Sequence, residues 1–380
     1  MKIDFYKHNL STNYQKFFSD VLKTNFLTSG DVGKKVEKSL SKFFSVKYSL
    51  LTNSWTNGAL ATLLAINIKP GDEVIVPAMT FVATANVIEL LGAKPVFVDV
   101  DKDSFLIDFN KVSKAINKRT KAIIPVHLYG NMVNIKSLRD LINKKTNNKI
   151  YIIEDSAHCF EGKFNNKLSG AYSDFAIFSF YATKNITCGE GGAIITNHKS
   201  LFEKIKEIRT HGMTNDAIRR FQKKNYVPWN MNRLGIKANL PDLLACLIPK
   251  QILEVYKNHR KREKAHLFYD ILLKNLQLKT PVLNNLCQKA YHLYVILVNP
   301  NQRSNIIKYL NAKGIMCTIN YTSVTNLNYY KKKYKIKTKD FKISNTLGKS
   351  VISLPFHTNI KRSDQEYVAT MLKEAIKKYE

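Results

Sequence analysis

The chain has 380 residues, of which 44% are hydrophobic, and its 60 Lys and Arg against 29 Asp and Glu give a formal net charge of +31. The hydrophobic share excludes a disordered or fibrous chain, and the length suits two domains because single cores stop growing near ~250 to 300 residues. The charge fits a phosphate-rich partner, but the lysines are dispersed, without an RRM, zinc-finger or helix-turn-helix pattern. We therefore interpret it as a solvated surface and expect no nucleic-acid partner.

The sequence also argues against a membrane protein and against a metal-binding protein. No apolar stretch approaches the ~20 residues that span a bilayer, and the first residues lack the apolar region of a signal peptide. The five cysteines are scattered and never form a CxxC pair, which argues against a disulfide framework and a cysteine-rich zinc site. We expect a cytoplasmic protein with reduced thiols, no metal and no membrane insertion.

Short apolar runs alternate with helical patterns between about residues 50 and 200. Such runs are typical of strands buried on both faces of a mainly parallel sheet, and the intervening segments carry helix periodicity. The sequence therefore predicts an α/β sheet between helices. The predicted strands are Glu73–Val76, Pro95–Val98, Ala122–Val126, Ile150–Ile153, Phe175–Phe180 and Ala193–Thr196.

The C-terminal part reads as a second, smaller unit. A long helical region runs from Pro241 to Leu273 with an interruption at Pro249, followed by a strand at Tyr291–Val298 and a helix at Arg303–Ala312. Ser363 and Glu366 form a capping-box pattern, which predicts a last helix that begins there.

Two charged residues stand at the ends of predicted strands. Ligands of a doubly wound sheet bind at the carboxyl ends of its strands, and Asp155 and Lys184 each follow one. A carboxylate after an apolar strand needs a positive partner, and a desolvated lysine can form a Schiff base. Pyridoxal phosphate needs both groups, with an aromatic ring and phosphate donors. The alternative is a structural ion pair between Asp155 and Lys184.

Several motifs together resemble one enzyme family, the DegT-type sugar-nucleotide aminotransferases. The similarity runs from about residue 25 to the C-terminus. It rests on TSGDVGKKVEKSL from Thr28, PGDEVIVPAMTFVATANVIELLGAKPVFVDVD from Pro70, KAIIPVHLYGN from Lys121, IIEDSAH from Ile152, FSFYATKNITCGEGGAIITN from Phe178, LGIKANLPDLLA from Leu234, YHLYVILV from Tyr291, INY from Ile319 and SLP from Ser353.

The resemblance implies a fold and a division into domains. The fold is pyridoxal-phosphate fold type I, with a mainly parallel seven-stranded sheet between helices and a smaller α+β C-terminal domain. The large cofactor-binding domain would cover residues 1–250, with an N-terminal arm at 1–30, and the small domain residues 251–380.

The resemblance also implies cofactor-binding roles. Lys184 would hold pyridoxal phosphate as a Schiff base and move the proton between the substrate and the cofactor, and Asp155 would keep the ring nitrogen protonated. Phe81 would stack on the ring, and the alternative is an ordinary core aromatic. The phosphate would lie at the start of the helix after Ser54, bound by the Trp55 backbone N–H and the hydroxyls of Thr56 and Ser179.

Other roles depend on positions where the chain departs from the family. His158 stands where the family commonly has Gln beside the phenolic oxygen of the cofactor, and a packed histidine is the alternative. Lys237 and Asn239 replace a common Asn-x-Arg; in a homodimer with shared active sites, Lys237 would reach the phosphate of the neighbouring subunit, or it is simply an exposed lysine. The substrate pocket would include Thr28, His127, Tyr181, Asn320 and Tyr321.

These residues lead to a functional expectation. We expect transamination from L-glutamate to a nucleotide-linked 4-keto sugar, giving a 4-amino sugar nucleotide for surface glycan or lipopolysaccharide synthesis. Lys184 favours transamination because related sugar 3-dehydratases carry His at this position. The alternatives are 3-amination on the same scaffold and a non-catalytic basic regulator.

Overall fold

The computed structural model describes residues 2–214 and 229–379. Its centre is a seven-stranded sheet with the order β1-β8-β7-β5-β4-β2-β3. Strand β8 runs antiparallel to both its neighbours, and the other pairs are parallel. The predicted α/β fold with a mainly parallel sheet is therefore confirmed. The strands are β1 Tyr48–Thr52, β2 Glu73–Pro77, β3 Lys94–Val98, β4 Thr120–Ile123, β5 Tyr151–Asp155, β7 Phe175–Ser179 and β8 Gly192–Thr196.

Helices cover both faces of this sheet. Alternate residues of a strand point to opposite faces, and Phe175 and Ile177 of β7 pack in one apolar cluster while Ala176 and Phe178 pack in another. The first cluster includes side chains from α3, α4 and α7, and the second includes side chains from α2 and α10. The helices of this part are α1 Gln15–Leu22, α2 Asp31–Phe44, α3 Trp55–Ala65, α4 Ala83–Glu89, α5 Phe109–Ala115, α6 Ile135–Lys145, α7 Lys199–Ile208, α9 Asp242–Ala245 and α10 Ile248–Leu273.

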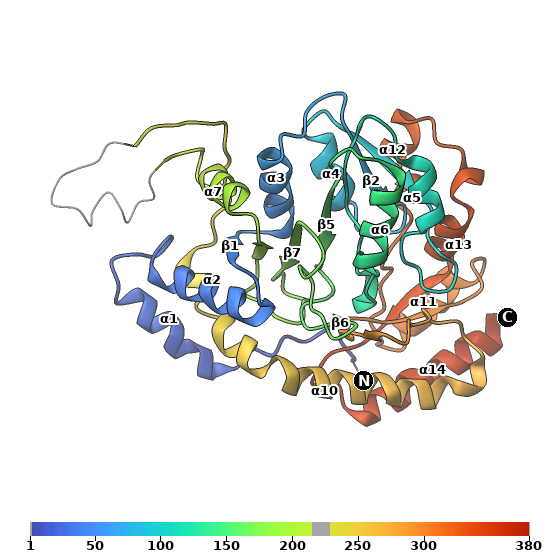
Figure 1. Ribbon diagram of the computed structural model, residues 1–380. Helices are drawn as coiled ribbons and strands as arrows, with labels where there is room; N and C mark the ends of the chain where they lie inside the picture. The colour runs from blue at the N-terminus through green and yellow to red at the C-terminus, as the bar shows by residue number, and fades with distance from the viewer. Residues whose placement is uncertain (1, 215–228, 380) are drawn as a thin grey trace.

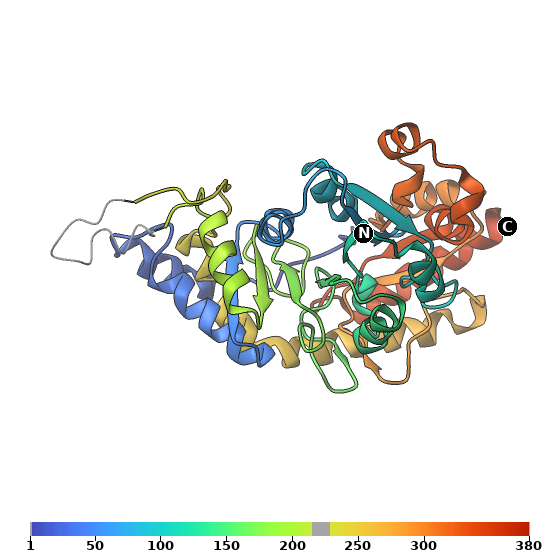
Figure 2. The same cartoon turned by 45° about the horizontal axis from the view of Figure 1, so that its top comes forward.

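A second core lies at the C-terminal end of the molecule. The antiparallel pair of β10 (Tyr294–Leu297) and β11 (Val351–Leu354) packs with α11 (Arg303–Ala312), α14 (Arg362–Tyr379) and the end of α10. Helix α10 runs along the base of the molecule from α2 to α14, and α12 (Asn328–Lys333) and α13 (Lys342–Ser350) lie at the same end as α14 (Figures 1 and 2). A short pair, β6 Lys163–Phe164 and β9 Cys287–Gln288, completes the strands. The predicted domain boundary at 250/251 falls in the first turn of α10 and stays a prediction.

Some local predictions need correction. Strand β1 was not predicted, although it pairs with β8 over its whole length. The predicted interruption of the helical region is present but lies just before Pro249, between α9 and α10, and Pro249 itself is in the first turn of α10, where a proline loses no hydrogen bond. The Ser363 capping box is wrong: α14 begins at Arg362, and the Asp364 carboxylate accepts from the Lys361 N–H at 3.3 Å.

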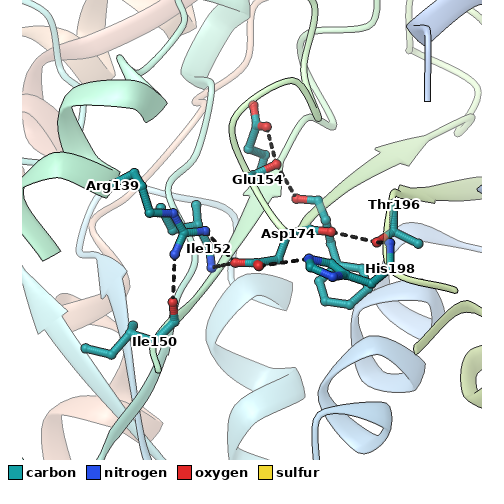
Figure 3. Close-up of polar contacts among 9 residues, drawn as sticks. Arg139, Ile150, Ile152, Glu154, Asp174, Thr196 and His198 are labelled. Atoms are coloured by element: carbon teal, nitrogen blue, oxygen red, sulfur yellow. Dashed lines mark hydrogen bonds and ion pairs between the residues drawn. The ribbon is translucent and has the colours of Figure 1, made fainter. Parts of the chain in front are cut away.

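The amino end of the sheet is fixed by a single carboxylate. Asp174, just before β7, accepts from the Arg139 guanidinium at 2.6 Å, from the Ile152 N–H of β5 at 2.8 Å and from His198 Nε2 at 3.1 Å (Figure 3). Its backbone oxygen accepts from the Thr196 hydroxyl of β8 at 2.8 Å. One residue therefore joins β5, β7, β8 and α6, at the edge of the sheet opposite the carboxyl ends of β5 and β7.

Replacing Asp174 by Asn keeps the shape but removes the charge that Arg139 and His198 bind. We expect the free energy of unfolding to fall by about 1–3 kcal/mol, since hydrogen bonds to charged groups are the stronger ones. Urea denaturation measures this change. The control is Asp140→Asn, a solvent-exposed carboxylate next to Arg139, for which we expect a change within about 0.5 kcal/mol. Equal effects of the two substitutions would contradict this account of Asp174.

Candidate active site

A pocket of about 500 Å³ opens at the carboxyl ends of the parallel strands. Strand β2 is followed by Phe81, β5 ends at Asp155, and β7 ends at Ser179 and is followed by Lys184. These residues meet because parallel strands end at the same edge of the sheet. The C-terminal part of the chain closes the other side. The predicted site residues that line the pocket are Trp55, Thr56, Phe81, Asp155, His158, Ser179, Tyr181, Lys184, Asn320 and Tyr321.

Asp155 lies buried at the inner wall of the pocket, with 5% of its surface exposed. Its carboxylate accepts from the Thr84 hydroxyl at 3.0 Å and from the Ala157 N–H at 3.1 Å. Burial raises the pKa of Asp155, while these two hydrogen bonds and the nearby charge of Lys184 lower it. A positively charged N–H in the pocket would stabilise the ionised form further.

Lys184 follows β7 in a tight turn, in which its N–H donates to the Tyr181 carbonyl at 2.9 Å. Burial lowers the pKa of the Lys184 amine to about 8, and the Asp155 carboxylate opposes this shift. A lysine with such a pKa is partly uncharged near neutral pH, which a nucleophilic amine requires.

The start of helix α3 forms an anion-binding end of the pocket. Ser54, rather than Thr56, is the N-cap, and its hydroxyl accepts from the Asn57 N–H at 3.1 Å. The first N–H groups of a helix have no partner within it, so those of Trp55 and Thr56 are open to an anion, beside the Thr56 and Ser179 hydroxyls. The chain passes close here, since a Cβ on Gly192 would lie 2.7 Å from the Ser54 backbone.

His158 and Tyr321 form a hydrogen-bonded pair in the pocket. The Tyr129 N–H donates to His158 Nδ1 at 3.2 Å, so the ring proton is on Nε2, which donates to the Tyr321 hydroxyl at 2.9 Å. Burial and the neighbouring Lys184 and His292 hold the pKa of His158 well below its usual value, so the ring is neutral. The Phe81 ring lies 5.5 Å from that of Tyr321 between centroids, and 55% of Phe81 is exposed.

Three predicted residues do not line this pocket. His127 is fully buried: Nδ1 accepts from the Val133 N–H at 3.0 Å, and Nε2 donates to Glu154 at 2.6 Å, so it cannot contact a sugar there and the prediction is wrong in this respect. Thr28 is exposed, and its carbonyl accepts from the Asp242 N–H. Lys237 is exposed and forms an isolated bridge with Thr210. The dimer role of Lys237 stays a prediction.

Other pocket residues were not predicted. Thr84 binds Asp155, and the side chains of Thr80 and Thr84 lie one helical turn apart, joined by a 2.9 Å hydrogen bond. Phe5 and His292 reach the pocket from distant parts of the chain. The sequence could have indicated two of these residues, because Thr80 follows a predicted strand and His292 lies in the YHLYVILV motif. No pattern in the sequence indicated Phe5.

The arrangement fits pyridoxal phosphate. The buried carboxyl of Asp155, the Lys184 amine, the exposed face of Phe81 and the helix start at Thr56 supply the four kinds of contact that the cofactor uses. Within residues 2–214 and 229–379, no cluster of three or more His, Cys, Asp or Glu side chains could hold a metal ion. In the same ranges, no helix is long and apolar enough to cross a membrane.

Comparisons with known proteins agree with this geometry. The spore coat polysaccharide biosynthesis protein SpsC of Bacillus subtilis is 30% identical over 365 residues, covering 94% of this chain and 93% of SpsC. The putative sugar aminotransferase Spr1654 of Streptococcus pneumoniae, in its PMP form, has a TM-score of 0.94 at 27% identity, with full coverage of both chains. PseC of Helicobacter pylori, an aminotransferase of pseudoaminic acid biosynthesis, has a TM-score of 0.90 at 28% identity, also with full coverage.

The match to a family model extends over nearly the whole chain. The model of the DegT/DnrJ/EryC1/StrS aminotransferase family aligns with residues 9–373. The predicted family and the predicted enzyme class, an aminotransferase, are therefore confirmed. The chain belongs to the DegT/DnrJ/EryC1/StrS aminotransferase family.

Proposed function

We propose that this aminotransferase moves an amino group from L-glutamate to the keto carbon at C4 of a nucleotide-linked sugar. The observation that carries the proposal is the meeting of Lys184 and Asp155 in one buried pocket, with His158 and Tyr321 beside them. SpsC, Spr1654 and PseC are named for polysaccharide, sugar and pseudoaminic acid chemistry, which supports a sugar substrate.

The cofactor is pyridoxal phosphate, as predicted. Structural relatives include Spr1654 in its PLP and PMP forms, and the chain has the residues for this cofactor. The cofactor supplies an aldehyde that an amine can attack and a ring that withdraws electrons from the substrate carbon. It requires a lysine with an uncharged amine and a carboxylate at the ring nitrogen, and Lys184 and Asp155 suit these two requirements.

The position of each side chain in the pocket indicates its role. Asp155 receives the charge of the ring nitrogen, and Thr84 and the Ala157 N–H keep its carboxylate oriented. Phe81 would cover one face of the ring, and Thr56, Ser179 and the start of α3 would bind the phosphate. Lys184 carries the proton to and from the substrate carbon. The single ring proton of His158, on Nε2, would turn from the Tyr321 hydroxyl to the phenolic oxygen of the cofactor.

The substrate assignment rests on further residues. Tyr181, Asn320 and Tyr321 line the pocket, and a sugar would lie against them. The Lys237 and Asn239 variant favours amination at C4, and 3-amination on the same scaffold is the alternative. A net charge of +31 would draw in the anionic diphosphate of a nucleotide sugar. The product would enter surface glycan or lipopolysaccharide synthesis.

The assembly and location belong to the same proposal. We propose a cytoplasmic homodimer in which Lys237 of one subunit reaches the phosphate in the other. Exposed apolar side chains near Lys237, which include Trp229, Met231 and Leu234, support an interface in this region.

A prediction on cofactor capture distinguishes the role of Lys184 from that of another buried lysine. Lys184→Ala is expected to abolish covalent capture of pyridoxal phosphate and to lower turnover at least about 100-fold, because the amine is the attacking group and the proton carrier. Borohydride reduction of the loaded protein followed by peptide mapping locates the modified lysine. The matched control is Lys289→Met, because burial also lowers the pKa of Lys289 to about 8 and its Nζ contacts His266 at 3.0 Å, outside the pocket. Covalent capture of pyridoxal phosphate at another lysine in Lys184→Ala would contradict the role assigned to Lys184.

The second prediction concerns pH. With a pKa of about 8, about a tenth of the Lys184 amine is uncharged at pH 7 and about half at pH 8. The rate at which the cofactor-free protein captures pyridoxal phosphate should therefore rise with pH and level off above pH 9. Stopped-flow absorbance measures it. A rate that keeps rising through pH 10, as for an ordinary lysine, would contradict the lowered pKa.

The third prediction tests the substrate. The holoenzyme, given glutamate, should aminate at least one member of a panel of UDP-, dTDP- and GDP-linked 4-keto sugars, with the product identified by mass spectrometry and NMR. Turnover with a 3-keto sugar alone would reject amination at C4. Failure with every keto sugar, while glutamate still converts the bound cofactor, would reject the sugar substrate but not the cofactor site.

A further inference from the structure

A buried ion pair lies behind the cofactor pocket. Glu161, in the segment after β5, is 0% exposed, and Arg262 of α10 is 3% exposed; the Arg262 Nη2 and the Glu161 Oε1 are 2.5 Å apart. Burying two charges is costly, and apolar side chains of the same size often serve stability as well. The position of this pair suggests a purpose other than stability.

The ion pair holds the residue that follows Lys184. Asn185 Nδ2 donates to Glu161 Oε1 at 3.0 Å, to Glu161 Oε2 at 3.2 Å and to the Ala290 carbonyl at 2.9 Å. These acceptors fix which end of the amide is nitrogen, because an oxygen could not donate to them. The Asn185 Oδ1 therefore points away from Glu161.

That oxygen sets the state of a histidine in the pocket wall. Asn185 Oδ1 lies 3.2 Å from His292 Nδ1, so Nδ1 carries the proton and Nε2 keeps its lone pair. Burial, together with the charges of Lys184 and Arg262, holds the pKa of His292 well below its usual value. The His292 ring packs on His158 with centroids 4.3 Å apart, and His158 in turn donates to Tyr321.

We propose that Glu161, held by Arg262, is a positioning residue for the cofactor site: through Asn185 it fixes the backbone next to Lys184 and keeps His292 in the tautomer with the proton on Nδ1. The ring of His292 then keeps His158 in place beside Tyr321. The inference rests on the proposed role of Lys184 and extends it to residues that do not touch the cofactor.

Several charged and titratable groups surround this chain of contacts. Glu161 and Arg262 are the charged pair, Asp155 faces Lys184 from β5, and Glu190 lines the same pocket. The narrow cleft on the other side of Lys184 and His292 is lined by Lys7, His8 and His357 among others. His259 and Cys159 interact with the Glu161–Arg262 pair itself, and further titratable neighbours of the pocket are His127, His158, Tyr129 and Tyr321.

Glu161→Gln tests the proposal because the amide group that replaces the carboxylate can accept hydrogen bonds at only one of its two end atoms. One atom of the new side chain can still accept from Asn185 Nδ2, but the other becomes an amide donor that repels it, so Asn185 and the proton position on His292 are no longer fixed. The Arg262 charge also loses its partner, which disfavours a positive charge near Lys184. We expect the dissociation constant of pyridoxal phosphate to rise on the order of tenfold, and the pH midpoint of the bound-cofactor absorption band to fall by at least about half a unit. Nitrogen NMR of labelled histidine reports the tautomer.

Two further variants separate positioning from loss of stability. His292→Phe keeps an aromatic ring against His158 but removes the contact to Asn185, and we expect weaker cofactor binding in this variant as well. Asp174→Asn breaks a less buried ion pair, at the far end of the sheet (Figure 3), and should lower the unfolding temperature without moving the cofactor band.

The outcomes are decisive in each case. Unchanged cofactor affinity and an unchanged band midpoint in both Glu161→Gln and His292→Phe would overturn the proposal, as would an equal shift in Asp174→Asn. If Glu161→Gln does not fold, His292→Phe alone decides. Failure of the Lys184 assignment is distinct, because peptide mapping would then find the cofactor on another lysine.

Discussion

The site depends on the burial of an amine and a carboxyl group at one edge of the sheet. Burial pushes Lys184 toward its uncharged form and lowers its pKa to about 8, and it raises the pKa of Asp155. Each group limits the shift of the other by its charge. The site is therefore ready to accept a positive ring nitrogen at Asp155 while Lys184 stays reactive, and neither condition would hold for two solvent-exposed side chains.

The two ends of strand β5 have different tasks. Near its start, the N–H of Ile152 is bound by Asp174, which also joins β5 to Arg139 and to β7 and β8 (Figure 3). At its end, Asp155 faces the pocket, and the preceding Glu154 faces the other way and accepts from His127 and the Gly170 N–H. The firm attachment of the strand at its amino end gives the catalytic end a rigid support.

The sequence predicted the site residues that stand at the ends of strands. It failed where the position of a residue depends on which face of the strand its side chain points to, or on packing between distant segments. Asp155, Ser179 and Lys184 follow apolar strands, so their meeting at one edge could be foreseen. His127 also follows a strand, but Val126 faces the pocket and the next side chain points away to Glu154, a choice that one residue of register decides. Phe5 comes from a segment whose packing no local pattern reveals.

The first residues of the chain also complete the pocket. The Ile3 N–H donates to the Gly314 carbonyl at 2.8 Å, the Phe356 N–H donates to the Phe5 carbonyl at 3.1 Å, and Phe5 lines the pocket. These partners lie more than three hundred residues apart, so the segment around Ile3 and Phe5 can dock only after Gly314 and Phe356 have been synthesised. Cofactor capture should thus wait for the synthesis of Phe356, because the pocket wall at Phe5 is held in place by it.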